Sequence, residues 1–207
     1  MAVASSVFVD MPAGSYDAAR PLIRNGDIAL FAGHGGMSRL IEHFTGSPFS
    51  HVGFIWRMDA IDRIMLLESV EDVGVRMLPL SSKVNGGLSG RPMDGQLLVA
   101  RHDDFPAPGA AFDAAFGEMT KVAVDRLGCP YNVEEIGLIG ANIAAALAHI
   151  DMPDVLKPSN AYICSEYADV CYRALGIEIA RSRPHFVAPA DFANDPKVKA
   201  IVTLKPD

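Results

Sequence analysis

The order of the predicted elements restricts the fold of this 207-residue chain more than any other feature. Segments typical of β-strands fill the first half, and from residue 110 the spacing of apolar residues becomes helical. The strand segments alternate or are bounded by turn residues, and they cover residues 26–32, 51–58, 63–70, 73–80 and 96–102. Strands followed by helices predict an α+β fold in which an antiparallel sheet packs against helices.

The helical segments differ in length and character. Helices are predicted at residues 38–46, 110–128, 136–150 and 161–176, and a last strand is predicted at residues 198–204. The apolar segment 136–150 is shorter than the roughly 20 residues that a membrane-spanning helix needs, so we expect no transmembrane segment. We interpret this segment as a buried core helix, with a helix that lies against lipid as the alternative.

Composition narrows the classes of partner and compartment. Half of the residues are hydrophobic and 21% are charged, which fits one domain with one substantial core. The net charge is -7 and no basic run occurs, so we expect no nucleic-acid partner. The N-terminus has no secretory pattern, which predicts a cytoplasmic protein. The three cysteines cannot all pair within the chain and show no metal-ligand spacing, so we expect a free thiol and neither metal nor cofactor.

Two cysteines of the helix predicted at residues 161–176 differ in position. An apolar stripe is predicted from residues at helical spacing, namely Ile163, Tyr167, Val170, Cys171, Ala174 and Leu175, and Gly176 is the predicted stop. Cys171 falls inside this stripe, whereas Cys164 lies in the first turn at its margin. A helix N-terminus stabilises a thiolate and can bind a developing oxyanion, so Cys164 is a candidate nucleophile.

The predicted hairpin of residues 51–58 and 63–70 offers a base and its partner. A two-residue loop places Glu68 directly opposite His51, and a four-residue loop places it opposite Gly53, diagonal to His51 on the same face. A three-residue loop would send Glu68 to the other face. The competing interpretation is that Glu68 lies in water at a strand end and that His51 binds a backbone carbonyl. The other histidines show no comparable partner.

Five segments together resemble a known family. They read "NGDIALFAGHGGMSRLIEHFTGSPFSHVGFIW", "LLESVEDVGVRMLPL", "LGCPYN", "YICSEYADVCYRALG" and "VAPADFAND". In this order they resemble the circularly permuted branch of the NlpC-type papain-fold cysteine hydrolases, the YiiX-like proteins. The resemblance implies a permuted papain-like fold, in which the histidine strand precedes the cysteine helix. It covers residues 25–195, which suggests an N-terminal extension at residues 1–24 and a single hydrolase domain at residues 25–207.

The resemblance also implies roles for individual residues. It implies a catalytic triad of Cys164, His51 and Glu68, with Tyr162 lining the site and polarising the substrate carbonyl. The implied activity is cleavage of an amide bond in a cell-wall-type peptide or a small amide. Two alternatives remain: a lipid hydrolase or acyltransferase that uses the same triad, with peripheral membrane contact, and a binding module without turnover. The substrate and the oligomeric state stay open.

Overall fold

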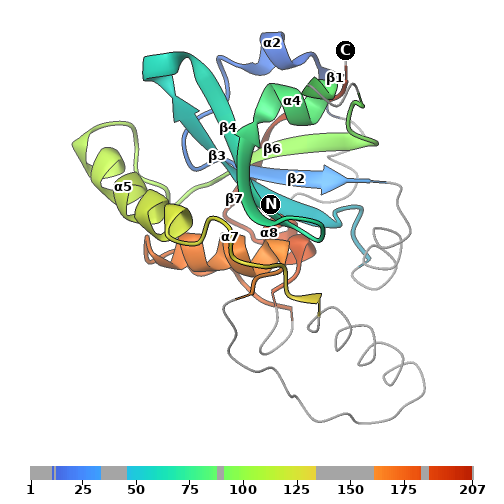
Figure 1. Ribbon diagram of the computed structural model, residues 1–207. Coiled ribbons are helices and arrows are strands. Elements are labelled where there is room, and N and C mark those ends of the chain that lie inside the picture. Colours follow the sequence, from blue (N-terminus) through green and yellow to red (C-terminus); the bar gives the residue numbers. More distant parts are fainter. Residues whose placement is uncertain are drawn as a thin grey trace.

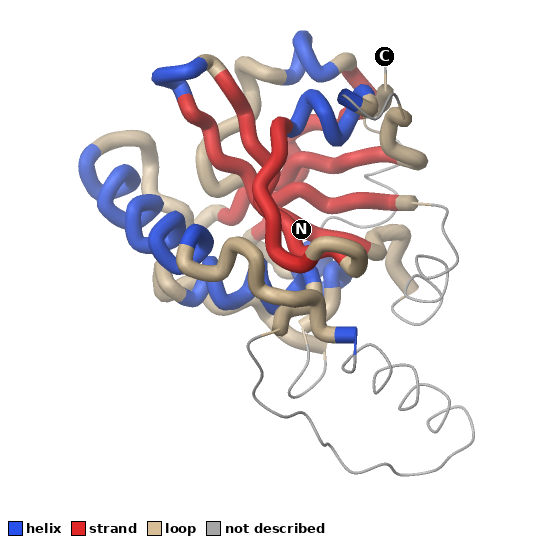
Figure 2. Tube along the Cα trace, in the orientation of Figure 1, coloured by secondary structure: helices blue, strands red, loops and turns tan. Residues whose placement is uncertain are grey.

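A seven-stranded sheet forms the centre of the computed structural model, which describes residues 11, 13–33, 46–87, 91–133, 161–182 and 187–206 (Figures 1 and 2). The strands are β1 (Ala13–Gly14), β2 (Ile28–Ala32), β3 (His51–Met58), β4 (Arg63–Val70), β5 (Gly74–Pro79), β6 (Gln96–His102) and β7 (Val198–Leu204). Their order across the sheet is β1-β7-β6-β2-β3-β4-β5. Neighbours are antiparallel except β1 and β7, which are parallel.

Helices cover both faces of the sheet (Figure 1). The described helices are α2 (Tyr16–Ala19), α4 (Leu80–Asn85), α5 (Ala110–Val124), α7 (Cys164–Arg173), α8 (Pro189–Asn194) and the 3-10 helix η1 (Asp59–Ile61). Helices α5, α7 and α8 pack on one face, and α2 and α4 pack on the other. None of these described helices has the length and apolar character that a membrane crossing requires.

The predicted α+β class is confirmed, and each predicted strand is found within two residues of its expected bounds. The helix predicted at residues 110–128 ends at Val124, where a series of turns begins. The helices predicted at residues 38–46 and 136–150 lie outside the described residues, apart from Gly46. All three cysteines are free thiols, whereas the sequence predicted only that at least one is free.

Alternation along β3 separates two hydrophobic cores. Val52 and Phe54 point to the face that carries α7, and Ile55 points to the face that carries α4. This period of two is the usual consequence of the β-strand pleat. Since β3 lies in the interior of the sheet and is buried on both faces, its sequence is almost continuously apolar after His51.

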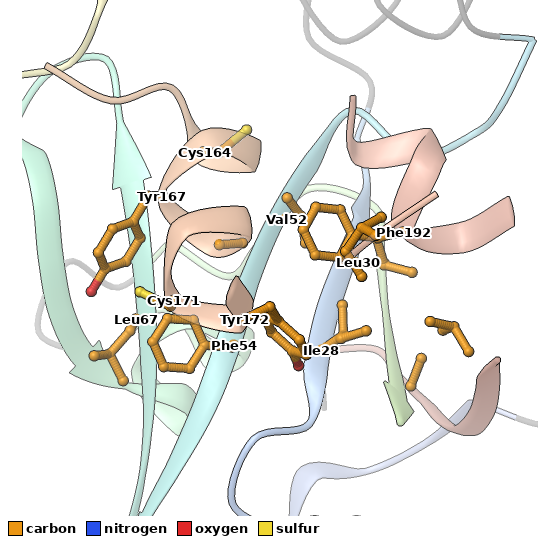
Figure 3. Packing of buried hydrophobic residues seen from close by; sticks show 14 of the residues in the cluster. Ile28, Leu30, Val52, Phe54, Leu67, Cys164, Tyr167, Cys171, Tyr172 and Phe192 are labelled. Carbon is orange, nitrogen blue, oxygen red and sulfur yellow. The ribbon is translucent and has the colours of Figure 1, made fainter. Parts of the chain in front are cut away.

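The buried face of α7 differs in part from the predicted stripe. Its apolar part consists of Cys164, Tyr167, Ala168, Cys171 and Tyr172, a set at helical spacing. Figure 3 shows four of these side chains, those of Cys164, Tyr167, Cys171 and Tyr172. The prediction was wrong for Ala174, which is exposed because the helix ends at Arg173. It also omitted Tyr172, whose hydroxyl donates a hydrogen bond to the Gly26 carbonyl. The predicted stripe was counted from Ile163, which lies just before the first helical residue, and it included positions beyond Arg173, where the helix ends.

Two buried carboxylates, those of Asp27 and Asp191, hold parts of the fold together. Asp27 is fully buried, and its carboxylate accepts hydrogen bonds from Arg101 at 2.7 and 2.9 Å, which ties the start of β2 to β6. Asp191 accepts hydrogen bonds from the backbone N–H groups of Ala188 and Ser182 at 2.8 and 3.0 Å. Each buried carboxylate is thus paired, as burial of charge requires.

The described part of the N-terminal segment is joined to the sheet. Ala13 and Gly14 form β1 at its edge, and Tyr16, Ala19 and Ile23 are buried in the core beneath α4. The domain boundary predicted at residue 24 stays a prediction.

Gly53 generates the first testable prediction, because β3 and β4 approach closely at this residue. A Cβ atom at Gly53 would lie 2.5 Å from the Leu67 carbonyl oxygen and 3.3 Å from the Glu68 Cβ atom. We expect Gly53→Ala to lower the free energy of unfolding by about 1–3 kcal/mol, as overpacking of a tight interior does, measured by urea denaturation.

Gly117→Ala is the matched control. This glycine lies inside α5, and a Cβ atom there would meet nothing within 4 Å. Alanine is favoured over glycine within a helix by about 1 kcal/mol, so this variant should gain stability. Equal effects of the two substitutions would contradict the packing described at Gly53.

Candidate active site

The turn between β3 and β4 brings Glu68 to His51. The paired positions run from Met58 with Arg63 to Phe54 with Leu67, so four residues connect the strands. Of the two loops that keep Glu68 on the face of His51, the structure has the four-residue one. The His51 Nε2 atom lies 2.7 Å from the Glu68 Oε2 atom, within hydrogen-bonding distance.

Glu68 is completely buried and is held by two cations besides His51. Arg76 donates to its Oε1 atom from Nε at 3.0 Å and from Nη2 at 2.6 Å, and the Lys83 Nζ atom lies 3.2 Å from Oε2. Burial alone would raise the pKa of Glu68, but the hydrogen bond and charge of His51, followed by the two cations, hold this pKa far below its usual range. Glu68 is therefore an ionised carboxylate, and the alternative of a solvated residue at a strand end is wrong.

His51 is held on two sides at the start of β3. Its side chain is 21% exposed, and its ring lies 5.2 Å from the Phe31 ring, centroid to centroid. Burial disfavours the imidazolium, but hydrogen bonding and charge interaction with Cys164 and then with Glu68 raise the pKa of His51 to about 9. These contacts favour the charged form of the imidazole, which lies between the Glu68 carboxylate and the Cys164 sulfur.

Cys164 is the first residue of α7 and is 5% exposed. Burial would raise the pKa of its thiol, but the charge and hydrogen bond of His51, followed by hydrogen bonds from the backbone N–H groups of Val52 and Ser165, lower it. The helix N-terminus adds its positive dipole end. These contacts favour the thiolate, the reactive form of cysteine.

A local opening between β3 and β4 admits the start of α7. The pairing of these strands ends at Phe54 and Leu67, before the residues nearest the site. At the opening, the Val52 N–H group binds the Cys164 sulfur, and the Ser69 hydroxyl donates to the Tyr162 carbonyl at 2.6 Å. Near the site, Val52 of β3 and Ser69 of β4 therefore form hydrogen bonds with α7 and the segment before it, and not with each other's strand.

Cys171 lies on the same helix, but no histidine is among the groups that shift the pKa of its thiol. It lies two turns after Cys164, among Phe54, Leu67 and Tyr167 in the core (Figure 3). Burial raises the pKa of Cys171 to about 12. The predicted difference between the two cysteines of α7 is therefore present in the structure.

Tyr162 lies two residues before Cys164 and is half-buried. Its hydroxyl accepts a hydrogen bond from the Arg126 Nε atom at 3.1 Å, and the Arg126 guanidinium also lies over its ring, 5.6 Å from the centroid. The Tyr162 backbone N–H group donates to the Pro130 carbonyl at 3.1 Å. These contacts fix the segment that leads into α7.

Three residues that hold predicted site residues were missed from the sequence: Arg76 and Lys83, which bind Glu68, and Arg126, which binds Tyr162. A signal existed for Arg76, because a three-residue connection between β4 and β5 places it directly opposite Glu68, the same counting that located Glu68. Lys83 lies on α4 and Arg126 lies just after α5. Their positions depend on helix packing, which strand counting does not give.

The donor set around Cys164 does not fit a metal ion. Within the described residues, no group of three or more His, Cys, Asp or Glu side chains is placed to hold one. The oxygens of Glu68, the carboxylate of the site, already accept from His51, Arg76 and Lys83. The positive charges of Arg76 and Lys83 would repel a cation at the same place.

The coupling between His51 and Cys164 predicts a pH effect. The pKa of His51 in the folded chain, about 9, lies above its ordinary value of 6.5. The resulting stabilisation is complete below pH 6.5 and is lost as the pH rises through 9. We expect Cys164→Ala to lower the pKa of His51, measured by NMR titration of the imidazole, because the thiolate no longer favours the charged ring.

Cys129→Ala is the control for this titration, since Cys129 is half-buried beside the start of β5 and is absent from the contacts that shift His51. It should leave the pKa of His51 unchanged. A pKa of His51 that is the same with and without the Cys164 sulfur would contradict the coupling.

Comparisons with known proteins identify the fold. No family model and no curated protein matches the chain. A solved structure that is similar is described as "metalloprotein yiiX from Escherichia coli O157:H7"; it has a TM-score of 0.62, 18% sequence identity, and a match that covers 89% of this chain and 99% of that one. At this identity the likeness shows that the chain shares the fold of the yiiX structure.

Proposed function

We propose that this chain is a cysteine hydrolase that cleaves an amide bond through a Cys164 thioester. The observation that carries the proposal is the contact of one imidazole, that of His51, with both a buried ionised carboxylate and a thiol at a helix N-terminus. A nucleophile, a base and a group that orients the base are the parts that nucleophilic catalysis requires.

The proposed reaction begins from the thiolate and the imidazolium. The Cys164 sulfur attacks the substrate carbonyl carbon, and a C–S bond forms as the carbonyl oxygen becomes an oxyanion. The oxyanion collapses, the C–N bond breaks, and His51 gives its proton to the leaving nitrogen. His51 then takes a proton from a water molecule, whose oxygen attacks the thioester; the C–S bond breaks, the acid is released and the thiolate returns.

Glu68 is proposed to orient the His51 ring and to stabilise its charged form. Glu68 stays ionised despite its burial, because His51 and then Lys83 and Arg76 stabilise the carboxylate. In this reaction Arg76 and Lys83 act as positioning residues, because they hold the carboxylate that orients His51.

The oxyanion is proposed to bind at the start of α7. The Cys164 backbone N–H group lies in the first turn, where helix N–H groups lack intrahelical partners. The Tyr162 hydroxyl is the proposed second donor. Because it accepts its hydrogen bond from Arg126, its own proton is free to be donated.

The order of the site residues along the chain agrees with the permuted arrangement. The strand that carries His51 precedes the helix that carries Cys164, and the two meet at one edge of the core. The shared fold with the yiiX structure is consistent with this assignment, and the substrate class of the resembling family is taken over here as part of the proposal.

The proposal predicts which thiol reacts. At pH 7, iodoacetamide should alkylate Cys164 faster than Cys129 or Cys171, because the site favours its thiolate whereas burial opposes ionisation of Cys171. Peptide mapping by mass spectrometry measures the order. Cys164→Ala should abolish hydrolysis and the acyl-enzyme mass adduct, and Cys129→Ala should keep both.

The substrate panel for this experiment contains short peptides with D-amino acids, small amides, acyl thioesters and phospholipids. Turnover of amides supports the proposed activity. Turnover of lipid esters alone would instead show a lipid hydrolase with the same triad. Hydrolysis by the Cys164→Ala variant at the wild-type rate would reject the assignment of the nucleophile.

Tyr162→Phe tests the oxyanion donor. We expect this variant to lower kcat by about 10²-fold or more with little change in KM, because the lost hydrogen bond forms mainly in the transition state. Tyr16→Phe on α2 is the control, since Tyr16 lies on the other face of the sheet and should leave kcat unchanged. An unchanged kcat for Tyr162→Phe would remove Tyr162 from the proposed mechanism.

A further inference from the structure

A cavity of about 550 Å³ opens beside His51, on the face of the sheet that carries α4. Its volume lies within the roughly 300–1,000 Å³ typical of small-molecule sites. His51 lines this cavity and also contacts Cys164, so a ligand in the cavity would lie next to the reacting groups.

Cationic side chains dominate the charged part of the cavity wall. Arg76, Lys83 and Arg91 line it, and Asp94 supplies one opposing carboxylate. Arg76 and Lys83 share one carboxylate, that of Glu68, which lies behind the wall and is 0% exposed. Two cations and one carboxylate leave one positive charge in excess. Because Arg76 and Lys83 are only 32% and 23% exposed, water solvates this excess charge incompletely.

Both cations have donors left for a ligand. The Arg76 guanidinium uses Nε and Nη2 for Glu68, and its Nη1 atom takes no part in that contact. The Lys83 ammonium lies over the Phe31 ring, 5.0 Å from its centroid, and an ammonium has three donors. A guanidinium and an ammonium side by side suit a carboxylate, which accepts from two directions.

The rest of the lining is apolar. Phe31, Val70, Leu78 and Met93 contribute to the wall of the cavity. The complementary ligand therefore has a short apolar portion and an anionic group, and the anionic group would meet the wall next to the base.

We propose that this cavity binds a carboxylate of the substrate, so that the amide cleaved at Cys164 carries an acidic group close to the scissile bond. This inference rests on the proposed function for the reaction itself, but the anion site can be tested without turnover. The excess charge of Arg76 and Lys83 over Glu68 is the feature that selects an anion.

The test is a titration of the ¹⁵N-labelled protein with glutarate and with glutaramide, the neutral analogue of the same length, followed by ¹H–¹⁵N NMR. We expect saturable shifts at cavity residues, including Ser50, Ser82 and Met93, for glutarate and not for glutaramide. Lys83→Met should weaken glutarate binding at least 5-fold. Arg91→Gln should weaken it too and serves as the second variant if Lys83→Met unfolds.

Lys121→Met is the matched control, because Lys121 is an exposed lysine of α5 paired with Glu118 on the opposite face of the molecule. It should bind glutarate as the wild type does. Equal responses to glutarate and glutaramide, or a loss in Lys121→Met as large as in Lys83→Met, would overturn the site. Tighter binding of inorganic phosphate at the same residues would overturn the assignment to a carboxylate.

The Cys164→Ala variant separates this inference from the proposed function. It should keep the glutarate affinity while it loses hydrolysis. Glutarate binding in a wild-type protein that hydrolyses no amide supports the anion site and rejects the hydrolase. Hydrolysis of neutral and acidic amides at equal kcat/KM, without selective glutarate binding, rejects the anion site and leaves the hydrolase standing.

Discussion

The buried carboxylate of Glu68 is the interaction on which the site depends. It joins four elements, since it lies on β4 and binds His51 of β3, Arg76 of β5 and Lys83 of α4. A buried charge costs several kcal/mol unless it is paired, so these partners are obligatory for the fold as well as for the site. The same contact that stabilises this corner of the sheet therefore fixes the orientation of the imidazole.

The opening between β3 and β4 is the second requirement. A continuous ladder would use the Val52 N–H group within the sheet, whereas here that group binds the Cys164 sulfur. Gly53 allows the strands to approach closely just beside this opening, and Ser69 binds the segment that enters α7. The sheet thus donates hydrogen bonds to α7 and to the segment before it, next to Cys164, His51 and the cavity.

Local patterns in the sequence predicted the strands and the different environments of Cys164 and Cys171. They left the length of the loop after β3 open, and the four-residue loop is one of the two that keep Glu68 on the face of His51. They succeeded where a period of two or a fixed turn determines which face a residue occupies. They failed where packing between distant elements decides, as for Lys83, or where the phase of a helix was taken from apolarity alone, as for Ala174. The cavity beside His51 combines residues of β2, β3, β4, β5 and α4, so its lining depends on how these elements pack together.

Because residues 51 and 164 lie far apart in the sequence, they come into contact only in the folded chain. Because the acidity of the Cys164 sulfur depends on His51, on the Val52 backbone and on a formed helix start, an unfolded chain holds an ordinary thiol at this position. Partial denaturation at the start of β3 would remove the contacts that activate Cys164 before the remaining sheet unfolds. The reactivity of the Cys164 thiol therefore reports whether this part of the chain is folded, because the contacts that lower its pKa exist only in the native structure.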